Sequence, residues 1–218
     1  MDSAEQGQLL LLLAGLYMFG LGLLAVLLAS LVSLLPLPPI IVATVVVIVV
    51  NIWAWREELR KSVLYVHSIL NLLGGAFVGV IVASWLSGLS GLITFLVSFS
   101  AMDLISFTKF GKWTLNRKLM GNGPLLKRLS VSLPYPGFPD LYPIIGVGDI
   151  FCFALIAGGA LQIWRASFLW IAIVAVGVGQ VLNVALVVLF RNRSWYRGLP
   201  ATVFPVLIFV LVALLQNG

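Results

Sequence analysis

Long apolar runs, separated by short polar or proline-containing breaks, dominate the chain. A helix needs about 20 predominantly apolar residues to cross the hydrocarbon core of a bilayer. Seven runs near this length lie at residues 9–35, 38–55, 63–86, 88–107, 141–163, 167–190 and 198–215. The pattern predicts an all-α polytopic membrane protein with about seven transmembrane helices. We expect a single transmembrane domain over residues 1–218, with one long loop at 108–140.

The composition agrees with this pattern. Hydrophobic residues make up 61% of the 218 residues and charged residues only 9%, whereas a soluble domain carries about a quarter charged residues. This excludes a soluble enzyme, a nucleic-acid-binding domain and a disordered tail, and makes the lipid bilayer the expected surroundings. The single cysteine, Cys152, excludes an intrachain disulfide and a multi-thiolate metal site. We expect no metal and no cofactor.

The positive charges predict the orientation of the chain, because cytoplasmic loops are enriched in Lys and Arg. Loops that follow odd-numbered spans hold only Arg165. The loops that follow even-numbered spans hold Arg56, Arg60, Lys61, Lys109, Lys112, Arg117, Lys118, Lys127, Arg128, Arg191, Arg193 and Arg197. The bias predicts a cytoplasmic N-terminus and an outside C-terminus, and therefore an odd number of spans.

Two charged residues fall inside apolar runs. Asp103 lies near the cytoplasmic end of the fourth predicted span, and Asp149 lies some eight residues into the fifth, about 12 Å deep. A carboxylate in hydrocarbon costs at least about 2.5–3.5 kcal/mol, and such residues are usually functional or paired. No Lys or Arg lies inside a span to serve as a partner. We expect the two carboxyl groups to face each other across a helix interface.

Two carboxyl groups in one low-dielectric site cannot both ionise cheaply, so they titrate as a unit. In such a pair the ionised member can take a proton from water while the protonated member polarises a carbonyl. The carboxyl groups alone leave two other interpretations open. They are unrelated protonated acids bonded to neighbouring helices, or a proton or cation relay in a transporter.

The residues around the two aspartates favour hydrolysis. Asp149 ends the sequence Gly146-Val147-Gly148-Asp149, and the last span opens with Pro200-Ala201-Thr202. Glycine permits close approach of a neighbouring helix or a substrate backbone. Proline removes a backbone donor and disfavours helix before it, which leaves extended main chain.

An intramembrane Asp, a GxGD motif in the next span and a Pro-Ala motif opening the last span resemble the presenilin and signal peptide peptidase family of intramembrane aspartyl proteases. The resemblance covers roughly residues 88–218. It implies that Asp103 and Asp149 are catalytic and that Gly146, Gly148 and the 200–202 motif help to bind substrate. It also implies a presenilin-like helix arrangement, transmembrane-helix proteins as substrates and a short, prokaryotic-type homologue in a cell membrane.

The chain departs from the family pattern at several points. Met102 stands where the family usually has Tyr, Thr202 stands where it usually has Leu, and about seven spans replace the usual nine. The predicted orientation resembles presenilin rather than signal peptide peptidase. It implies substrates with an outside N-terminus and a cytoplasmic C-terminus.

The long loop also contains a predicted strand. Leu129-Ser130-Val131-Ser132-Leu133 alternates apolar and polar residues at the period of a strand. We expect this segment, through Leu129, Val131 and Leu133, to pair with unwound substrate beside Asp149, because strand addition satisfies exposed backbone groups. The first part of the loop holds Trp113, Leu115, Leu119 and Leu126 among six Lys and Arg residues. This mixture suits a segment on an anionic membrane surface, or equally a basic loop that sets the topology.

Two alternatives for function remain open. A prepilin or preflagellin peptidase also uses GxGD chemistry near the cytoplasmic face, and a proton-coupled transporter would use the two Asp residues as a relay. The sequence leaves the oligomeric state open. It predicts structural roles for four polar residues within the spans: His67, Asn71, Gln180 and Asn183. It also predicts close helix packing at the glycine pair Gly75 and Gly79.

Overall fold

A computed structural model describes residues 3–135, 140–164, 169–190 and 200–217 of the chain. In these residues six helices are long and apolar enough to cross a membrane. They are α1 (Ser3–Val32), α2 (Leu37–Ala54), α3 (Lys61–Trp85), α4 (Gly88–Phe107), α7 (Val147–Trp164) and α8 (Leu169–Phe190). The chain is therefore a multi-pass, all-α membrane protein, as the sequence predicts. The last apolar run forms a shorter helix, α9 (Val203–Asn217).

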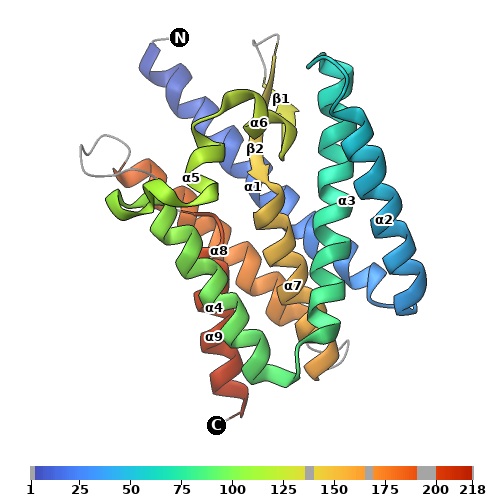
Figure 1. Ribbon diagram of the computed structural model, residues 1–218. Helices are drawn as coiled ribbons and strands as arrows, with labels where there is room; N and C mark the ends of the chain where they lie inside the picture. The colour runs from blue at the N-terminus through green and yellow to red at the C-terminus, as the bar shows by residue number, and fades with distance from the viewer. Residues whose placement is uncertain (1–2, 136–139, 165–168, 191–199, 218) are drawn as a thin grey trace.

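Helix α7 lies at the centre of the bundle. Figure 1 shows α2 and α3 on one side of α7, with α4 and α9 on the other. Residues 152–160 of α7 are all buried. Two glycines of α3 allow α3 and α7 to pack closely. A Cβ on Gly79 would lie 2.7 Å from the carbonyl oxygen of Phe151, and a Cβ on Gly75 would lie 3.1 Å from the carbonyl oxygen of Val147. The prediction of close packing at these glycines is confirmed.

The segment between α4 and α7 is folded. It contains a short 3₁₀ helix, η1 (Lys109–Trp113), two short helices, α5 (Leu115–Met120) and α6 (Gly123–Arg128), and a hairpin of β1 (Ser130–Pro134) and β2 (Leu141–Gly146). Figure 1 shows these elements at the same end of the bundle as the N-terminus, and the C-terminus at the opposite end.

The strands pair in antiparallel register. Ser130 lies opposite Gly146 and Pro134 opposite Leu141, with an irregularity between Val131 and Ser132. The strand expected at 129–133 is confirmed to within one residue at each end. Its partner in the structure is β2, a segment of the same chain.

The predicted fifth span, 141–163, is wrong at its start. Residues 141–146 form β2, and α7 begins only at Val147. Pro143 cannot donate a helical hydrogen bond, and the β-branched pair Ile144 and Ile145 suits an extended backbone. Asp149 is therefore the third residue of α7 and not a residue eight positions into a helix.

Candidate functional site

Asp149 owes its position to the junction between β2 and α7. The backbone N–H of Val147 donates to the carbonyl oxygen of Leu129 at 3.0 Å, which ties the start of α7 to the residue before β1. The carboxylate oxygen Oδ2 of Asp149 accepts a hydrogen bond from the backbone N–H of Gly146 at 3.1 Å. A carboxylate three residues into a helix commonly reaches back in this way. The GxGD sequence thus fixes the Asp149 side chain at the first turn of the helix.

The two glycines of this motif have different environments. A Cβ on Gly146 would lie 3.3 Å from Oδ2 of Asp149, whereas one on Gly148 would lie 3.7 Å from the ring of Phe99, which is ordinary contact. Gly146 therefore allows the carboxylate to fold back over the strand end, and Gly148 leaves room beside the aromatic ring.

Asp103 lies in the last turns of α4, near the end predicted from the sequence. Both of its carboxylate oxygens have partners from other elements. Oδ2 accepts from the Thr202 hydroxyl at 3.0 Å, and Oδ1 accepts a hydrogen bond from the amide Nδ2 of Asn116 in α5. Asp103 is thus joined both to the turn before α9 and to the folded loop.

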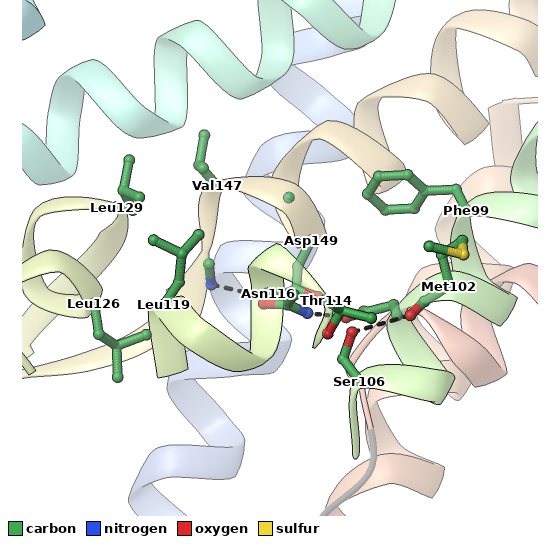
Figure 2. A pocket seen from close by; sticks show the side chains of 13 residues that line it. Phe99, Met102, Ser106, Thr114, Asn116, Leu119, Leu126, Leu129, Val147 and Asp149 are labelled. Atoms are coloured by element: carbon green, nitrogen blue, oxygen red, sulfur yellow. Dashed lines mark hydrogen bonds between the residues drawn. The ribbon is translucent and has the colours of Figure 1, made fainter. Parts of the chain in front are cut away.

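The two aspartates face one pocket of about 460 Å³. Asp103 comes from α4 and Asp149 from α7, so two helices bring their carboxyl groups to this pocket. In Figure 2, Leu119, Leu126, Leu129 and Val147 gather on one side of Asp149 and Asn116, and Phe99 and Met102 lie on the other. The two carboxyl groups expected to meet across a helix interface thus line the same pocket. Such a pocket can accept an apolar segment of a bound molecule, and its two carboxyl groups can then act on one polar group of that segment.

The Pro-Ala-Thr segment contacts Asp103 through its third residue, Thr202. Thr202 is fully buried, and Ala201 and Pro200 are also buried. The carbonyl oxygen of Ala201 accepts hydrogen bonds from Nε2 of Gln180 at 3.0 Å and from Nδ2 of Asn183 at 2.9 Å. The expected structural role of these two amides in α8 is confirmed.

Both sides of β1 are occupied in the structure. One side pairs with β2. On the other side, the backbone N–H of Ser132 donates to Oγ of Ser68 at 2.9 Å, and Asn71 of α3 donates to the carbonyl oxygen of Ser130 at 3.1 Å. A substrate strand could join β1 only by displacing one of these partners. The edge of the two-stranded sheet away from α3 belongs to β2.

The three residues of segment 129–133 that were expected to bind substrate do not all line the pocket. Leu129 lines the pocket. Val131 is buried in the hydrophobic core, and Leu133 packs against that core. Only Leu129 can therefore contact a molecule in the pocket without a rearrangement of the hairpin.

A polar network in α3 holds the hairpin and α6 in place. Nδ1 of His67 lies 2.6 Å from Oδ1 of Asn51, and Nε2 lies 3.2 Å from Nη1 of Arg128. Asn71 also donates to the carbonyl oxygen of Arg128 at 2.8 Å. The predicted structural role of His67 and Asn71 is confirmed.

Sequence reasoning missed the contribution of the loop to the pocket. Asn116, Leu119 and Leu126 line the pocket, and the sequence predicts no role in the site for any of them. The apolar residues sit among basic ones, a mixture that equally suits a membrane surface. No pattern in the sequence indicates that Asn116 would reach Asp103.

The fold and the site together define a multi-pass α-helical membrane protein with a pocket that contains two carboxyl groups. Comparisons with protein-family models, with curated proteins and with solved structures gave no match.

Proposed function

We propose that this protein is an intramembrane aspartyl protease that resembles the presenilin and signal peptide peptidase family. It hydrolyses peptide bonds in or near transmembrane helices of substrate proteins, with Asp103 and Asp149 as the catalytic pair. One observation carries the proposal: Asp103 and the GxGD aspartate Asp149, which are far apart in sequence, line one apolar pocket, and Thr202 of the Pro-Ala-Thr segment donates a hydrogen bond to Asp103.

The chemistry needs the two carboxyl groups and a water molecule. The ionised carboxylate takes a proton from water, and the water oxygen bonds to the carbonyl carbon of the scissile peptide. The protonated carboxyl gives its proton to the carbonyl oxygen, which forms a neutral tetrahedral diol. The C–N bond then breaks, a proton passes to the leaving nitrogen, and a new carboxyl and a new amine are released.

The proposed topology has seven spans. Helix α9 has 15 residues, or about 22 Å at 1.5 Å per residue, which is short for a bilayer core of about 30 Å. The buried segment 200–202 extends this crossing, as non-helical backbone is tolerated at membrane depth where protein covers it. The basic loops support a cytoplasmic N-terminus, and the proposed location is a prokaryotic cell membrane. In this orientation, substrates have an outside N-terminus.

A helical substrate must unwind before its peptide bond can react. Its exposed N–H and C=O groups then need new partners inside the membrane. The outer edge of β2 leads directly to Gly146 and the pocket, so we infer that substrate adds to β2 rather than to β1. The apolar pocket walls accept large apolar side chains beside the scissile bond.

The test is cleavage of single-span reporter proteins by the purified protein in liposomes. Reporters are supplied in both orientations and compared across the parent, Asp103→Asn, Asp149→Asn and Asp140→Asn. Asp140 is an exposed carboxylate outside the pocket and serves as the matched control. We expect products from the parent and the control alone, with the N-outside reporter preferred. Absence of products together with Asp103-dependent proton flux would instead identify a transporter.

A further inference from the structure

The folded loop supplies a polar contact to the dyad that the GxGD and Pro-Ala motifs do not include. Nδ2 of Asn116, an amide nitrogen, donates to Oδ1 of Asp103, while the Thr202 hydroxyl donates to Oδ2. The two donors come from α5 and from the turn before α9. They approach different oxygens of the same carboxyl group and so fix its rotation.

Asn116 is held firmly enough to act in this way. Thr114 caps α5 by accepting from the N–H of Arg117 at 3.3 Å, and its hydroxyl donates to the carbonyl oxygen of Gly111 at 2.7 Å. Gly111 lies directly on the end of α4, where a Cβ would come 2.1 Å from the carbonyl oxygen of Ile105. Helix α5 is thereby attached to the helix that carries Asp103.

The second aspartate has a different set of partners. Oδ2 of Asp149 accepts from the backbone N–H of Gly146. Within the described residues, Oδ1 of Asp149 accepts no hydrogen bond from another protein group. An ionised carboxyl group is an acceptor at both oxygens, whereas a protonated one has a donor at one oxygen. The pattern at Asp103 matches the ionised form, and Asp149 has an oxygen available for a proton.

We propose that Asn116 and Thr202 are positioning residues that hold Asp103 as the ionised, water-activating member of the pair, with Asp149 as the proton donor. This inference rests on the proposed function and adds a role for each aspartate. Each carboxylate oxygen can accept two hydrogen bonds. Asp103 therefore keeps acceptor positions for a water molecule after both donors have bound.

The kinetic test uses Asn116→Ala and Thr202→Val, with Lys118→Ala as the control on the exposed side of α5. A hydrogen bond to a charged group is worth about tenfold to hundredfold in rate. We expect each test variant to lose about that factor in kcat with little change in KM, and the acidic limb of its pH–rate profile to move to higher pH. Thr202→Ser keeps the hydroxyl and should restore the parent rate and profile.

A second pair of variants tests the attachment of α5. Gly111→Ala must displace η1 and α5 from the end of α4, and it should reproduce the Asn116→Ala profile. Gly123→Ala is the matched control, because a Cβ there meets nothing within 4 Å. Unchanged kcat and pH profile in both Asn116→Ala and Thr202→Val would overturn the inference while leaving the protease proposal intact.

An infrared titration decides the inference without any substrate. The carboxyl band of Asp103 is assigned by its loss in Asp103→Asn. We expect the carboxylate form to persist to lower pH in the parent than in Asn116→Ala. Identical titrations would overturn the inference. A difference in titration without cleavage of any reporter by the parent would support the two positioning contacts and contradict the protease proposal.

Discussion

At the scale of single residues, the amide side chains inside the bundle support the site indirectly. Gln180 and Asn183 both donate to the carbonyl oxygen of Ala201, next to the residue that contacts Asp103. A buried carbonyl group without a donor costs about 1–3 kcal/mol. These two amides therefore fix the turn from which the Thr202 hydroxyl reaches the carboxylate.

We predict that Asn183→Leu destabilises the protein by about 0.5–1.5 kcal/mol, the net worth of one hydrogen bond. The Gln180→Leu/Asn183→Leu double variant should lose more than the sum of the single variants, because it removes both donors from the same carbonyl oxygen. Thermal unfolding in detergent measures both effects. Val181→Ala, on the exposed face of α8, is the control. Simple additivity would contradict a shared acceptor.

Some residues of the site can be identified from the sequence and others cannot, and the difference has physical reasons. Asp103 and Asp149 stand out because an ionisable group in an apolar run is costly, so each can be found without a structure. Asn116 carries no such signal, since a neutral amide in a polar loop is ordinary. The hydroxyl of Thr202 looks like a departure from a family motif, and only the fold shows that it contacts a carboxylate.

At the scale of elements, the packing of α3 against α7 positions Asp149. A Cβ on Gly79 would lie 2.6 Å from the Cβ of Ala154 and 2.7 Å from a backbone oxygen. Neither of these atoms can move as the end of a flexible side chain could. The distance between the two helices therefore depends on the absence of a side chain at Gly79.

We predict that Gly79→Ala destabilises the protein by about 1–3 kcal/mol, the usual cost of overpacking. It should also lower proteolytic activity, because α7 carries Asp149. Gly20→Ala in α1 is the matched control, since an added Cβ meets nothing within 4 Å there. Thermal unfolding and reporter cleavage are the measurements. Equal stability of the two variants would show that α3 and α7 do not pack this closely.

The hairpin is the second element on which the site depends. Asn71 donates to the carbonyl oxygens of Arg128 and Ser130, at the point where α6 leads into β1. We predict that Asn71→Ala increases hydrogen exchange at the amides of β1 and β2, because the carbonyl groups lose a buried donor. Ile69→Ala, exposed on the same helix, should leave exchange unchanged. Unchanged protection in Asn71→Ala would contradict this anchoring role.

Element boundaries are predictable where polar groups or prolines interrupt an apolar run, as at the break between α1 and α2. They are less predictable inside a continuous run. Residues 141–163 read as one span because strand β2 is as apolar as the helix that follows it. Hydropathy reports burial and does not distinguish a strand from a helix over such a short stretch.

At the scale of the whole molecule, the positions of the basic loops and the directions of the helices should predict the same membrane topology. The turn between α2 and α3 lies at the same end as the folded loop, and the turn between α3 and α4 lies at the other (Figure 1). In a Cys152→Ser background, we predict that Ser87→Cys reacts with an impermeant maleimide on intact cells. Glu57→Cys should react only after permeabilisation. The reverse labelling pattern would show that the topology is opposite to the one expected, and the expected orientation of the substrate would then be reversed as well.

The central claim is that Asp103 and Asp149 act as one catalytic unit. Residues that act as a unit show strongly non-additive effects on rate. The most direct test is the cleavage rate of one reporter by Asp103→Asn, Asp149→Asn and the double variant. We predict that each single variant loses as much activity as the double variant. Substantial cleavage by either single variant, or losses that simply add in free energy, would contradict the account.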